Sequence, residues 1–593
     1  MEEPQWWHRG TSSRLAARLV VEEAVAASTD RRLWLHGLRW GLATAGTVTL
    51  LAHVVWMWMG QFHAQDGPAH MFAASAWQRL LAGDAGALAA IYTVNFDPDP
   101  NWITYPMLSN LLRANPVRHA ELGVVTLLVV AMAAALYYAM TARGRATAPV
   151  AIAGFGIAVG WSLHTGLYNF TASVALLLLI VGYFIRIDGR LNVWRGLLLV
   201  GLTGLLYFSH PLSLVTTYLT VGVVGVTTAV ADARARRSWQ LLYVRIASLL
   251  VVAVPSLILL LGFLADPGTV VPRDNPRGLG DSLAGTLLLQ WPLQVTRGDT
   301  GWITGLAAAV WTVVAALLVR RFMRRDWNRW DVLLALSAVI GSCAVTLPDR
   351  LAGGTLVQPR LAIYALVTLL LWIGVANAEI SLAHWLGVGL GAVGVVVMVG
   401  LLTARIGPYR EIDTAIDEVA DVADAVVPGS TILGAVSSRA PNMSPVVPMV
   451  HVTDMVAVAA DAVPVSTLDA GSGYGPISYQ RRFDAGVALR AYPRNRTHGR
   501  QVTPSKFRNA ARRYAEVTGR PFDYILLVDY RLSGEDLQEF ADMGFRLVRR
   551  SRPTGIAHLF EVTPQVLPGS YARRAATPAP RTDMRQARGG RGT

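Results

Sequence analysis

The chain of 593 residues could hold about four soluble domains of roughly 150 residues each, but its composition excludes that organisation. Hydrophobic residues make up 53%, charged residues only 16%, and the mean hydropathy is +0.39, values typical of an integral membrane protein. The formal net charge of +14 is what basic cytoplasmic loops produce in such a protein, so we expect no nucleic-acid partner. The single cysteine, Cys343, excludes an intramolecular disulfide.

The first segment, residues 1–37, mixes acidic and basic residues and has no long apolar run. We expect a cytoplasmic, amphipathic stretch and not a cleavable signal peptide, because the first apolar run begins too late. Residues 38–405 then contain about eleven apolar runs, most of them long enough to cross a bilayer as helices. Two of these runs, the third and the fifth, are short. The centres lie near Val48, Val130, Ile157, Leu176, Leu202, Val221, Val251, Ala309, Leu336, Thr368 and Val395.

Arginine clusters mark every second loop between these runs, for example at residues 186–195, 234–245 and 320–329. Arginines near span ends remain cytoplasmic, so the alternate loops, including 61–119 and 265–301, should face outside. Basic residues are nearly all arginine, which we attribute to a GC-rich bacterial genome. The sequence therefore predicts a multi-pass protein of the bacterial inner membrane with a cytoplasmic N-terminus.

After the last run the pattern changes. Residues 406–566 alternate helix-like amphipathic stretches with short apolar strands, which is typical of a small α/β domain, and an odd number of spans places it outside the cytoplasm. Residues 567–593 are rich in Pro, Gly, Ala and Arg, so we expect a disordered basic tail. The expected strands are Thr431–Ala435, Tyr524–Val528 and His558–Val562, and the expected helices are Glu411–Val426, Pro504–Thr518 and Ser533–Met543.

The first outside loop starts with Asp66-Gly-Pro-Ala-His70, directly after the first span. The acid and the histidine are spaced i, i+4, so both side chains can face one cavity if a helix begins at Pro68. A carboxylate beside an imidazole at a membrane surface could act as a general base. The alternative is that Asp66 only caps the helix.

Several short motifs, taken in order, resemble the GT-C family of polytopic glycosyltransferases. They are the Asp66 to His70 segment, Tyr92-Thr-Val-Asn-Phe96, Asp99-Pro-Asn-Trp102, Leu167-Tyr-Asn-Phe170, Ser209-His-Pro211 and Gln358-Pro-Arg360. The resemblance covers residues 60–405 loosely, and many spans followed by an extracytoplasmic α/β domain agree with it. It implies a helical membrane fold that transfers a sugar from a polyprenyl-phosphate donor to a glycan, glycolipid or protein acceptor of the cell envelope. One difference is that several members carry two adjacent acidic residues in this loop, whereas Gly67 follows Asp66 here.

By this resemblance Asp66 would be the base, with His70 beside it, in a reaction that inverts the anomeric carbon. Arg360 would bind the donor phosphate as a bidentate guanidinium at the outside end of a span, although snorkelling to the interface also explains it. His210 would be a second phosphate or sugar contact, or part of a plain tight turn. The remaining candidates for substrate contacts are Tyr168, Asn169, Asn101 and Arg273; interfacial tyrosines are also common without such a role.

A second candidate feature of the first loop is Asp97 and Asp99, each followed by a proline. Two carboxylates could bind a divalent metal, but carboxylates between prolines also form rigid turns, and we expect no required metal or cofactor. The apolar patch Leu287–Leu293 is too short to span; it could lie over a lipid donor or pack on the soluble domain.

Two other classes of function compete with a transferase. A transporter or flippase of a lipid-linked glycan would place ionisable groups in mid-span, where this sequence has almost none. A non-catalytic envelope assembly protein would use its extracytoplasmic domain for binding.

Overall fold

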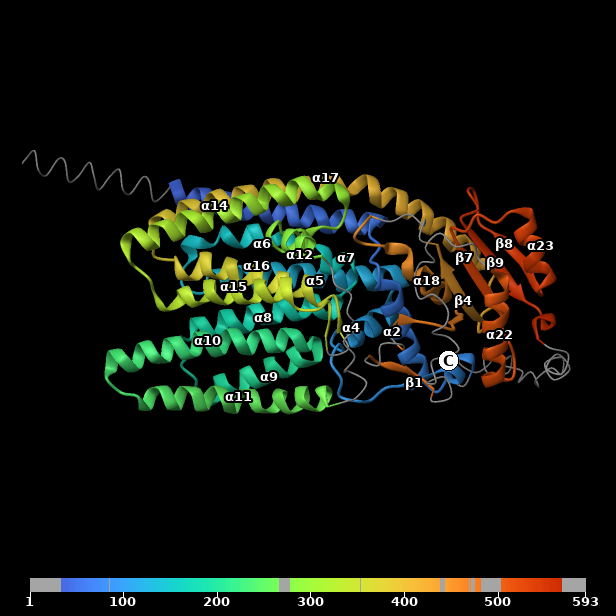
Figure 1. Cartoon of the computed structure of the whole chain (residues 1–593), viewed down its shortest axis with the longest axis horizontal. Coiled ribbons are helices and arrows are strands. Elements are labelled where there is room, and N and C mark those ends of the chain that lie inside the picture. The colour runs from blue at the N-terminus through green and yellow to red at the C-terminus, as the bar shows by residue number, and fades with distance from the viewer. Residues whose placement is uncertain are drawn as a thin grey trace, which may run out of the picture.

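The computed structural model describes residues 34–84, 86–265, 278–351, 354–437, 443–468, 470, 475–480 and 503–567. In this part of the chain a long bundle of helices carries a smaller, sheet-containing domain at one end (Figure 1). Of residues 1–37 only the last four are described, and Arg273 and residues 568–593 lie outside the described residues.

Nine helices among the described residues are long and apolar enough to cross a membrane, and two shorter apolar helices, Val150–His164 and Val193–Ser209, lie among them. Each of the eleven predicted centres falls in one of these helices, and the two short ones are the third and fifth runs. The predicted α-helical polytopic class is confirmed. The bundle comprises Trp34–Gly60 with its π-helical end η1 (Met57–Gln61), α5 (Val117–Met140), α6 (Val150–Ala158), α7 (Trp161–His164), α8 (Tyr168–Arg186), α9 (Val193–Ser209), α10 (Pro211–Arg236), α11 (Gln240–Leu264), α14 (Thr300–Arg324), α15 (Val332–Thr346), α16 (Val357–Leu371) with η6 (Trp372–Ala376), and α17 (Ser381–Ala420).

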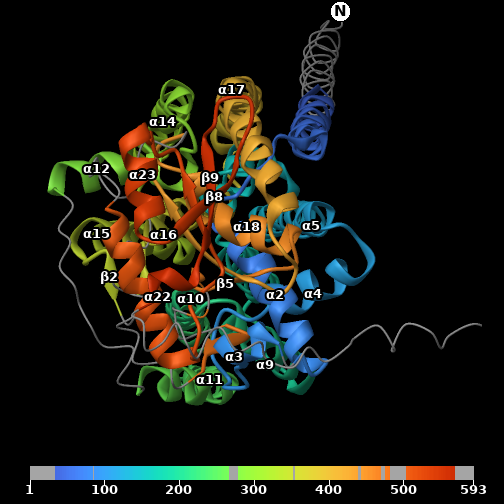
Figure 2. The ribbon, with the colours of Figure 1, turned by 90° about the vertical axis from the view of Figure 1, so that its right-hand side faces the viewer.

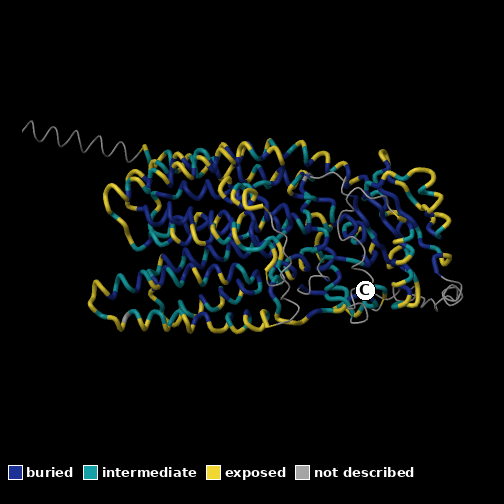
Figure 3. Tube along the Cα trace, in the orientation of Figure 1, coloured by how far each residue is buried: buried dark blue, intermediate teal, exposed yellow. Residues whose placement is uncertain are grey.

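Burial separates central from peripheral helices. In the apolar stretch of α16, 94% of residues are buried inside the protein, and in α8 78%, against 22% in α11. The outer face of α11 exposes Val251, Ile258 and Leu261, each by more than 60% of its surface, as expected for side chains that meet lipid (Figure 3). Helices α8 and α16 therefore form the centre of the bundle, and the surrounding helices fix the positions of the side chains at their ends.

Ion pairs gather the arginine-rich loops at one end of the bundle. Arg329 bonds Asp188 at 2.9 Å, and Arg245 bonds Asp232 at 2.6 Å, with Arg329 also 3.5 Å from Asp232. This arginine-rich end lies away from the sheet-containing domain (Figure 1). Such a separation is what the predicted orientation requires, and the orientation itself remains a prediction.

The opposite end carries short elements between the spans. They are α2 (Gly67–Leu81), α3 (Ala87–Ile91), β1 (Tyr92–Val94), α4 (Thr104–Ala114), α12 (Leu279–Leu287), α13 (Gln290–Leu293), β2 (Arg350–Leu351) and β3 (Gly354–Thr355). Helix α13, which holds the last residues of the patch Leu287–Leu293, packs against α16 and α7, so this part of the patch lies on the bundle.

The C-terminal domain is a five-stranded sheet with helices, as the sequence predicted. Its order is β5-β4-β7-β9-β8, with β4 parallel to β5 and β7, and β9 antiparallel to β7 and β8. The predicted strands are β4, β7 and β9, and α22 has the predicted bounds. The elements are η7 (Asp421–Ala425), β4 (Thr431–Val436), η8 (Pro448–His451), α18 (Val452–Ala459), β5 (Val463–Pro464), β6 (Ile477–Tyr479), α22 (Pro504–Thr518), β7 (Tyr524–Val528), α23 (Gly534–Asp542), β8 (Phe545–Arg550), β9 (Ala557–Val562) and η9 (Pro564–Val566).

The first outside loop and the C-terminal domain are joined. Strand β1 pairs antiparallel with β6, where Tyr92 lies opposite Tyr479, and α18 packs against α2 (Figure 2). The backbone N–H of Val447 donates to the Gln65 side-chain oxygen at 3.0 Å. Residues of the C-terminal domain therefore reach the segment that begins with Asp66.

Candidate functional site

The start of α2 is fixed by the turn that precedes α8. The N–H groups of Gln65 and Asp66 donate to the carbonyls of His164 and Thr165, both at 3.0 Å. Gly166 has φ +84°, and a Cβ there would lie 2.9 Å from the Asp66 nitrogen, so only glycine permits this close approach. Because the turn holds the backbone of Asp66, the direction of its carboxylate is set by the bundle.

Asp66 occupies the N-cap position of α2 but makes no side-chain capping hydrogen bond, so the capping alternative is not supported. The residue is only 9% exposed. Its Oδ1 accepts a hydrogen bond from Gln65 Nε2 at 3.2 Å and lies 3.5 Å from His451 Nε2. The carboxylate is thus held at the junction of bundle and C-terminal domain, among polar groups.

A second carboxylate, Glu121 of α5, lies beside Gly67. A Cβ on Gly67 would be 1.9 Å from Glu121 Oε1 and 3.0 Å from the Tyr168 hydroxyl oxygen, and that hydroxyl donates to Glu121 Oε1 at 2.5 Å. Sequence reasoning missed Glu121. An acidic residue at the start of an otherwise apolar span was the available signal, because such residues are expensive in a membrane.

His70 lies on the same side of the site. Its Nδ1 is 3.0 Å from the Tyr105 hydroxyl, and its ring centre is 5.7 Å from that of Tyr168. The structure therefore brings His70 and Tyr168 together with the two carboxylates, in what we call the carboxylate cluster: Asp66, Glu121, Tyr168 and His70.

Arg360 and His210 lie away from these residues, and both contact the ring of Phe170. The Arg360 guanidinium carbon lies 5.3 Å from the centre of the Phe170 ring, and the His210 ring centre is 5.2 Å from it. Burial, and secondarily the charge of Arg360, lower the pKa of His210 well below its usual value. We call Arg360, His210 and Phe170 the cationic cluster. Its guanidinium contacts an aromatic face inside the bundle, which simple snorkelling would not require.

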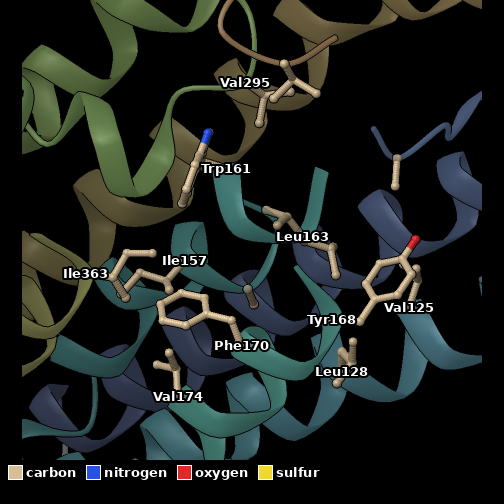
Figure 4. Close-up of a cluster of buried hydrophobic side chains, with 14 of the residues drawn as sticks. Val125, Leu128, Ile157, Trp161, Leu163, Tyr168, Phe170, Val174, Val295 and Ile363 are labelled. Atoms are coloured by element: carbon tan, nitrogen blue, oxygen red, sulfur yellow. The ribbon is translucent and has the colours of Figure 1, made fainter. Parts of the chain in front are cut away.

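The first turn of α8 joins the two clusters. Tyr168 belongs to the carboxylate cluster, and Phe170, two residues later, belongs to the cationic cluster. Figure 4 shows the rings of Tyr168 and Phe170 lying apart from each other. A rigid, central helix end therefore sets the distance between a carboxylate pair and a guanidinium.

Asn169, between these two residues, holds the first loop. Its Oδ1 accepts from the N–H and the hydroxyl of Thr104, both at 2.9 Å, and its Nδ2 donates to the Asn101 carbonyl at 2.8 Å. These contacts show the two asparagines supporting the loop; a substrate contact for either remains a prediction, as it does for Arg273.

Asp97 and Asp99 lie in a hydrogen-bonded turn. Asn95 Oδ1 accepts from the Asp97 N–H at 2.9 Å, and Asn95 Nδ2 donates to Asp99 at 3.2 Å. No group of three or more His, Cys, Asp or Glu residues that could hold a metal ion is found in the described ranges.

No protein-family model and no curated protein matches this chain. The solved structures to which it is similar include ArnT from Cupriavidus metallidurans, in the apo state and bound to undecaprenyl phosphate. Both are 12% identical, with TM-scores of 0.48 and 0.47. The similarity covers 90% and 88% of this chain and 100% and 98% of those chains.

Proposed function

We propose that this chain is a membrane glycosyltransferase of the GT-C type, which transfers a sugar from a polyprenyl-phosphate donor to an acceptor of the cell envelope outside the cytoplasm. One observation carries the proposal: the first turn of α8 holds a buried carboxylate cluster on one side and the guanidinium of Arg360 on the other. Undecaprenyl phosphate, which one of the similar ArnT structures binds, is a lipid of the proposed donor class.

In the proposed reaction the acceptor hydroxyl oxygen attacks the anomeric carbon of the donor sugar. Asp66 takes the hydroxyl proton as the new C–O bond forms, and the bond to the lipid phosphate breaks on the opposite face, so the configuration inverts. The bonding electron pair leaves with the phosphate, whose charge is met by Arg360. A guanidinium in a site of low dielectric stabilises a phosphate through paired hydrogen bonds.

The two carboxylates have different surroundings, and this supports Asp66 as the base. Glu121 accepts the Tyr168 hydroxyl and lies against Gly67, inside the first turn of a span. Asp66 lies at the junction with the C-terminal domain, the side from which a hydrophilic acceptor would arrive. Glu121 is therefore assigned to holding Tyr168, and Asp66 to accepting the proton.

The location of the site argues against a transporter. Its residues lie where α2, α5, α8, α10 and α16 begin, and α2 packs against α18 of the C-terminal domain. A substrate pathway through the bundle would need ionisable groups at mid-membrane depth. A site confined to one end favours chemistry at the membrane surface.

The test uses purified full-length protein and a panel of isotopically labelled polyprenyl-phosphate sugars, with release of polyprenyl phosphate as the readout. Asp66→Asn keeps the size of the side chain and removes its basicity, so turnover should fall by about 10²–10⁴-fold. Asp281→Asn, on an exposed carboxylate of α12, is the matched control and should be fully active. Full activity of Asp66→Asn would refute the assigned base. Loss of activity in Glu121→Gln alone would move that role to Glu121. If no donor of the panel is consumed, while vesicles holding the protein translocate a lipid-linked glycan, the chain is a transporter.

A further inference from the structure

A histidine of the C-terminal domain reaches the proposed base. His451 ends η8, and its Nε2 lies 3.5 Å from Asp66 Oδ1. Its Nδ1 lies 3.5 Å from Asp454 Oδ2, one turn further along. The three side chains are 10%, 12% and 3% exposed for His451, Asp66 and Asp454. A carboxylate, an imidazole and a second carboxylate thus form a buried row across the junction of the two parts.

The packing of α18 fixes the position of this imidazole. The helix lies against α2 and also against β4, where a Cβ on Gly434 would be 1.8 Å from the Thr453 hydroxyl oxygen. Just before His451, Val447 donates its N–H to Gln65, whose side chain donates in turn to the same Asp66 oxygen that His451 approaches. The segment from Val447 through α18 therefore packs between the sheet and the start of α2, and this packing places His451 next to Asp66.

We infer that His451 is a positioning residue for Asp66 that also receives its proton after each transfer, a role that rests on the proposed function. With a proton on Nδ1 directed at Asp454, the Nε2 lone pair faces Asp66. After Asp66 takes the acceptor proton, that proton moves from its carboxyl oxygen to Nε2. The resulting imidazolium lies between two carboxylates, and Asp66 is again a base. His451 then releases the proton to water, so no net charge accumulates in the site.

The pH dependence of turnover reports this role, because His451 must be neutral to receive the proton. Among the described residues, the titratable groups next to His451 are Asp66 and Asp454; Tyr168 of α8 interacts with Asp66, and Tyr92 of β1 interacts with Asp454. Glu121 of α5 lies beyond Tyr168 and interacts with His63, His70 and Arg118. The neighbouring carboxylates favour the protonated form of His451. Turnover should therefore rise with pH as His451 loses its proton, and this rising limb of the kcat–pH profile depends on Asp66, His451 and Asp454.

The experiment measures kcat against pH for the full-length protein with the donor that supports turnover. His451→Gln should lower kcat by roughly 10²-fold and move the rising limb to lower pH, because only carboxylates then titrate. Asp454→Asn keeps His451 but removes an anion that favours its protonated form, so the limb should move to lower pH with a smaller loss of kcat. In His451→Ala, added imidazole should restore part of the lost turnover, which a purely structural role would not allow.

The outcomes are separable from those of the proposed function. If wild type turns over, Asp66→Asn does not, and both His451→Gln and Asp454→Asn keep the wild-type limb, the inference about His451 is wrong and the base stands. The inference is also wrong if His451→Gln lowers kcat equally at every pH, without moving the rising limb, and if added imidazole does not restore turnover in His451→Ala. If Asp66→Asn is active, Asp66 is not the base and His451 has no proton to receive from it; the proposed function itself fails only if the wild type consumes no donor. If His451→Gln does not fold, the Asp454→Asn variant tests the inference: its rising limb in the kcat–pH profile should lie at lower pH than that of the wild type, and an unmoved limb contradicts the role of His451.

Discussion

At the scale of single residues, Gly67 sets how closely the two carboxylates of the site approach. Its missing side chain leaves room for Glu121 Oε1, which would be 1.9 Å from a Cβ. Several members of the family that this sequence resembles carry two adjacent acidic residues, whereas here the acid beside Gly67 is Glu121, which comes from another helix.

Gly67→Ala tests this arrangement. The added methyl group must displace Glu121 or the start of α2, which should destabilise the protein by about 1–3 kcal/mol and reduce turnover through the moved Asp66. Thermal unfolding and donor turnover of the full-length protein measure both effects. Gly262→Ala on α11, where nothing lies within 4 Å of a Cβ, is the control and should change neither. An unchanged unfolding temperature for Gly67→Ala would contradict the close approach.

Arg360→Lys separates phosphate binding from snorkelling. Lysine keeps the charge but loses the planar fork, so donor kcat/KM should fall by about 10–10²-fold, since a hydrogen bond to a charged group contributes about 1.5–3 kcal/mol. The measurement is donor kcat/KM at fixed acceptor concentration. Arg350→Lys, on an exposed arginine of β2, should be neutral. Equal activity of the two variants would leave Arg360 with an interfacial role only.

What the sequence could and could not predict at this scale follows from distance along the chain. Asp66 and His70 share one short motif, and Tyr168 belongs to another motif of the same resemblance, so all three could be named. Glu121 could have been noticed as an acid in an apolar span, but its position beside Gly67, like that of His451 beside Asp66, depends on the packing of α5 and α18 on α2. Long-range contacts of this kind need the folded chain.

At the scale of elements, α17 shows where a sequence pattern misleads. The sequence predicted a separate helix, Glu411–Val426, after the last apolar run, but α17 runs from Ser381 to Ala420 with Pro408 inside it, so the first part of that helix continues the last span. The apolar runs, by contrast, were identified correctly because a span must be both long and apolar.

Arg405 anchors α17 to the end of the bundle that carries the site. It is fully buried, with Nη2 3.0 Å from Asp299, and its guanidinium also donates to the carbonyls of Val159 and Leu293. Val159 lies just before α7, which leads into the turn that holds Asp66. One arginine thus connects the helix leading to the C-terminal domain with the turn under the proposed base.

Arg405→Met should therefore destabilise the protein by about 3–5 kcal/mol, because it leaves Asp299 buried without its cation. The measurement is thermal unfolding in detergent, followed by donor turnover at a temperature where the variant is folded. Arg410→Met, on an exposed arginine of the same helix, is the matched control. Coincident unfolding curves for the two variants would show that the buried pair does not hold α17.

At the scale of the whole molecule, the arginine-rich loops and the proposed site around Asp66 lie at opposite ends of the helix bundle. The arginine-rich end is tied together by Arg329, Asp188 and Asp232, while α2, which begins after Asp66, packs against α18 of the C-terminal domain at the other end of the bundle (Figure 1). If arginines stay in the cytoplasm, the site and the domain must be outside. A hydrophilic acceptor would then reach Asp66 without crossing the membrane.

The single native cysteine makes this orientation measurable in the full-length chain. In a Cys343→Ser background, Arg325→Cys places a thiol on the exposed arginine-rich end, and Glu535→Cys places one on the exposed start of α23. A membrane-impermeant maleimide added to spheroplasts should label Glu535→Cys, and should label Arg325→Cys only after the membrane is permeabilised. If Arg325→Cys is labelled in sealed spheroplasts and Glu535→Cys is not, the orientation is the reverse of the predicted one, and the site lies in the cytoplasm. The acceptor would then have to be cytoplasmic too, since the start of α2 and the C-terminal domain share one surface.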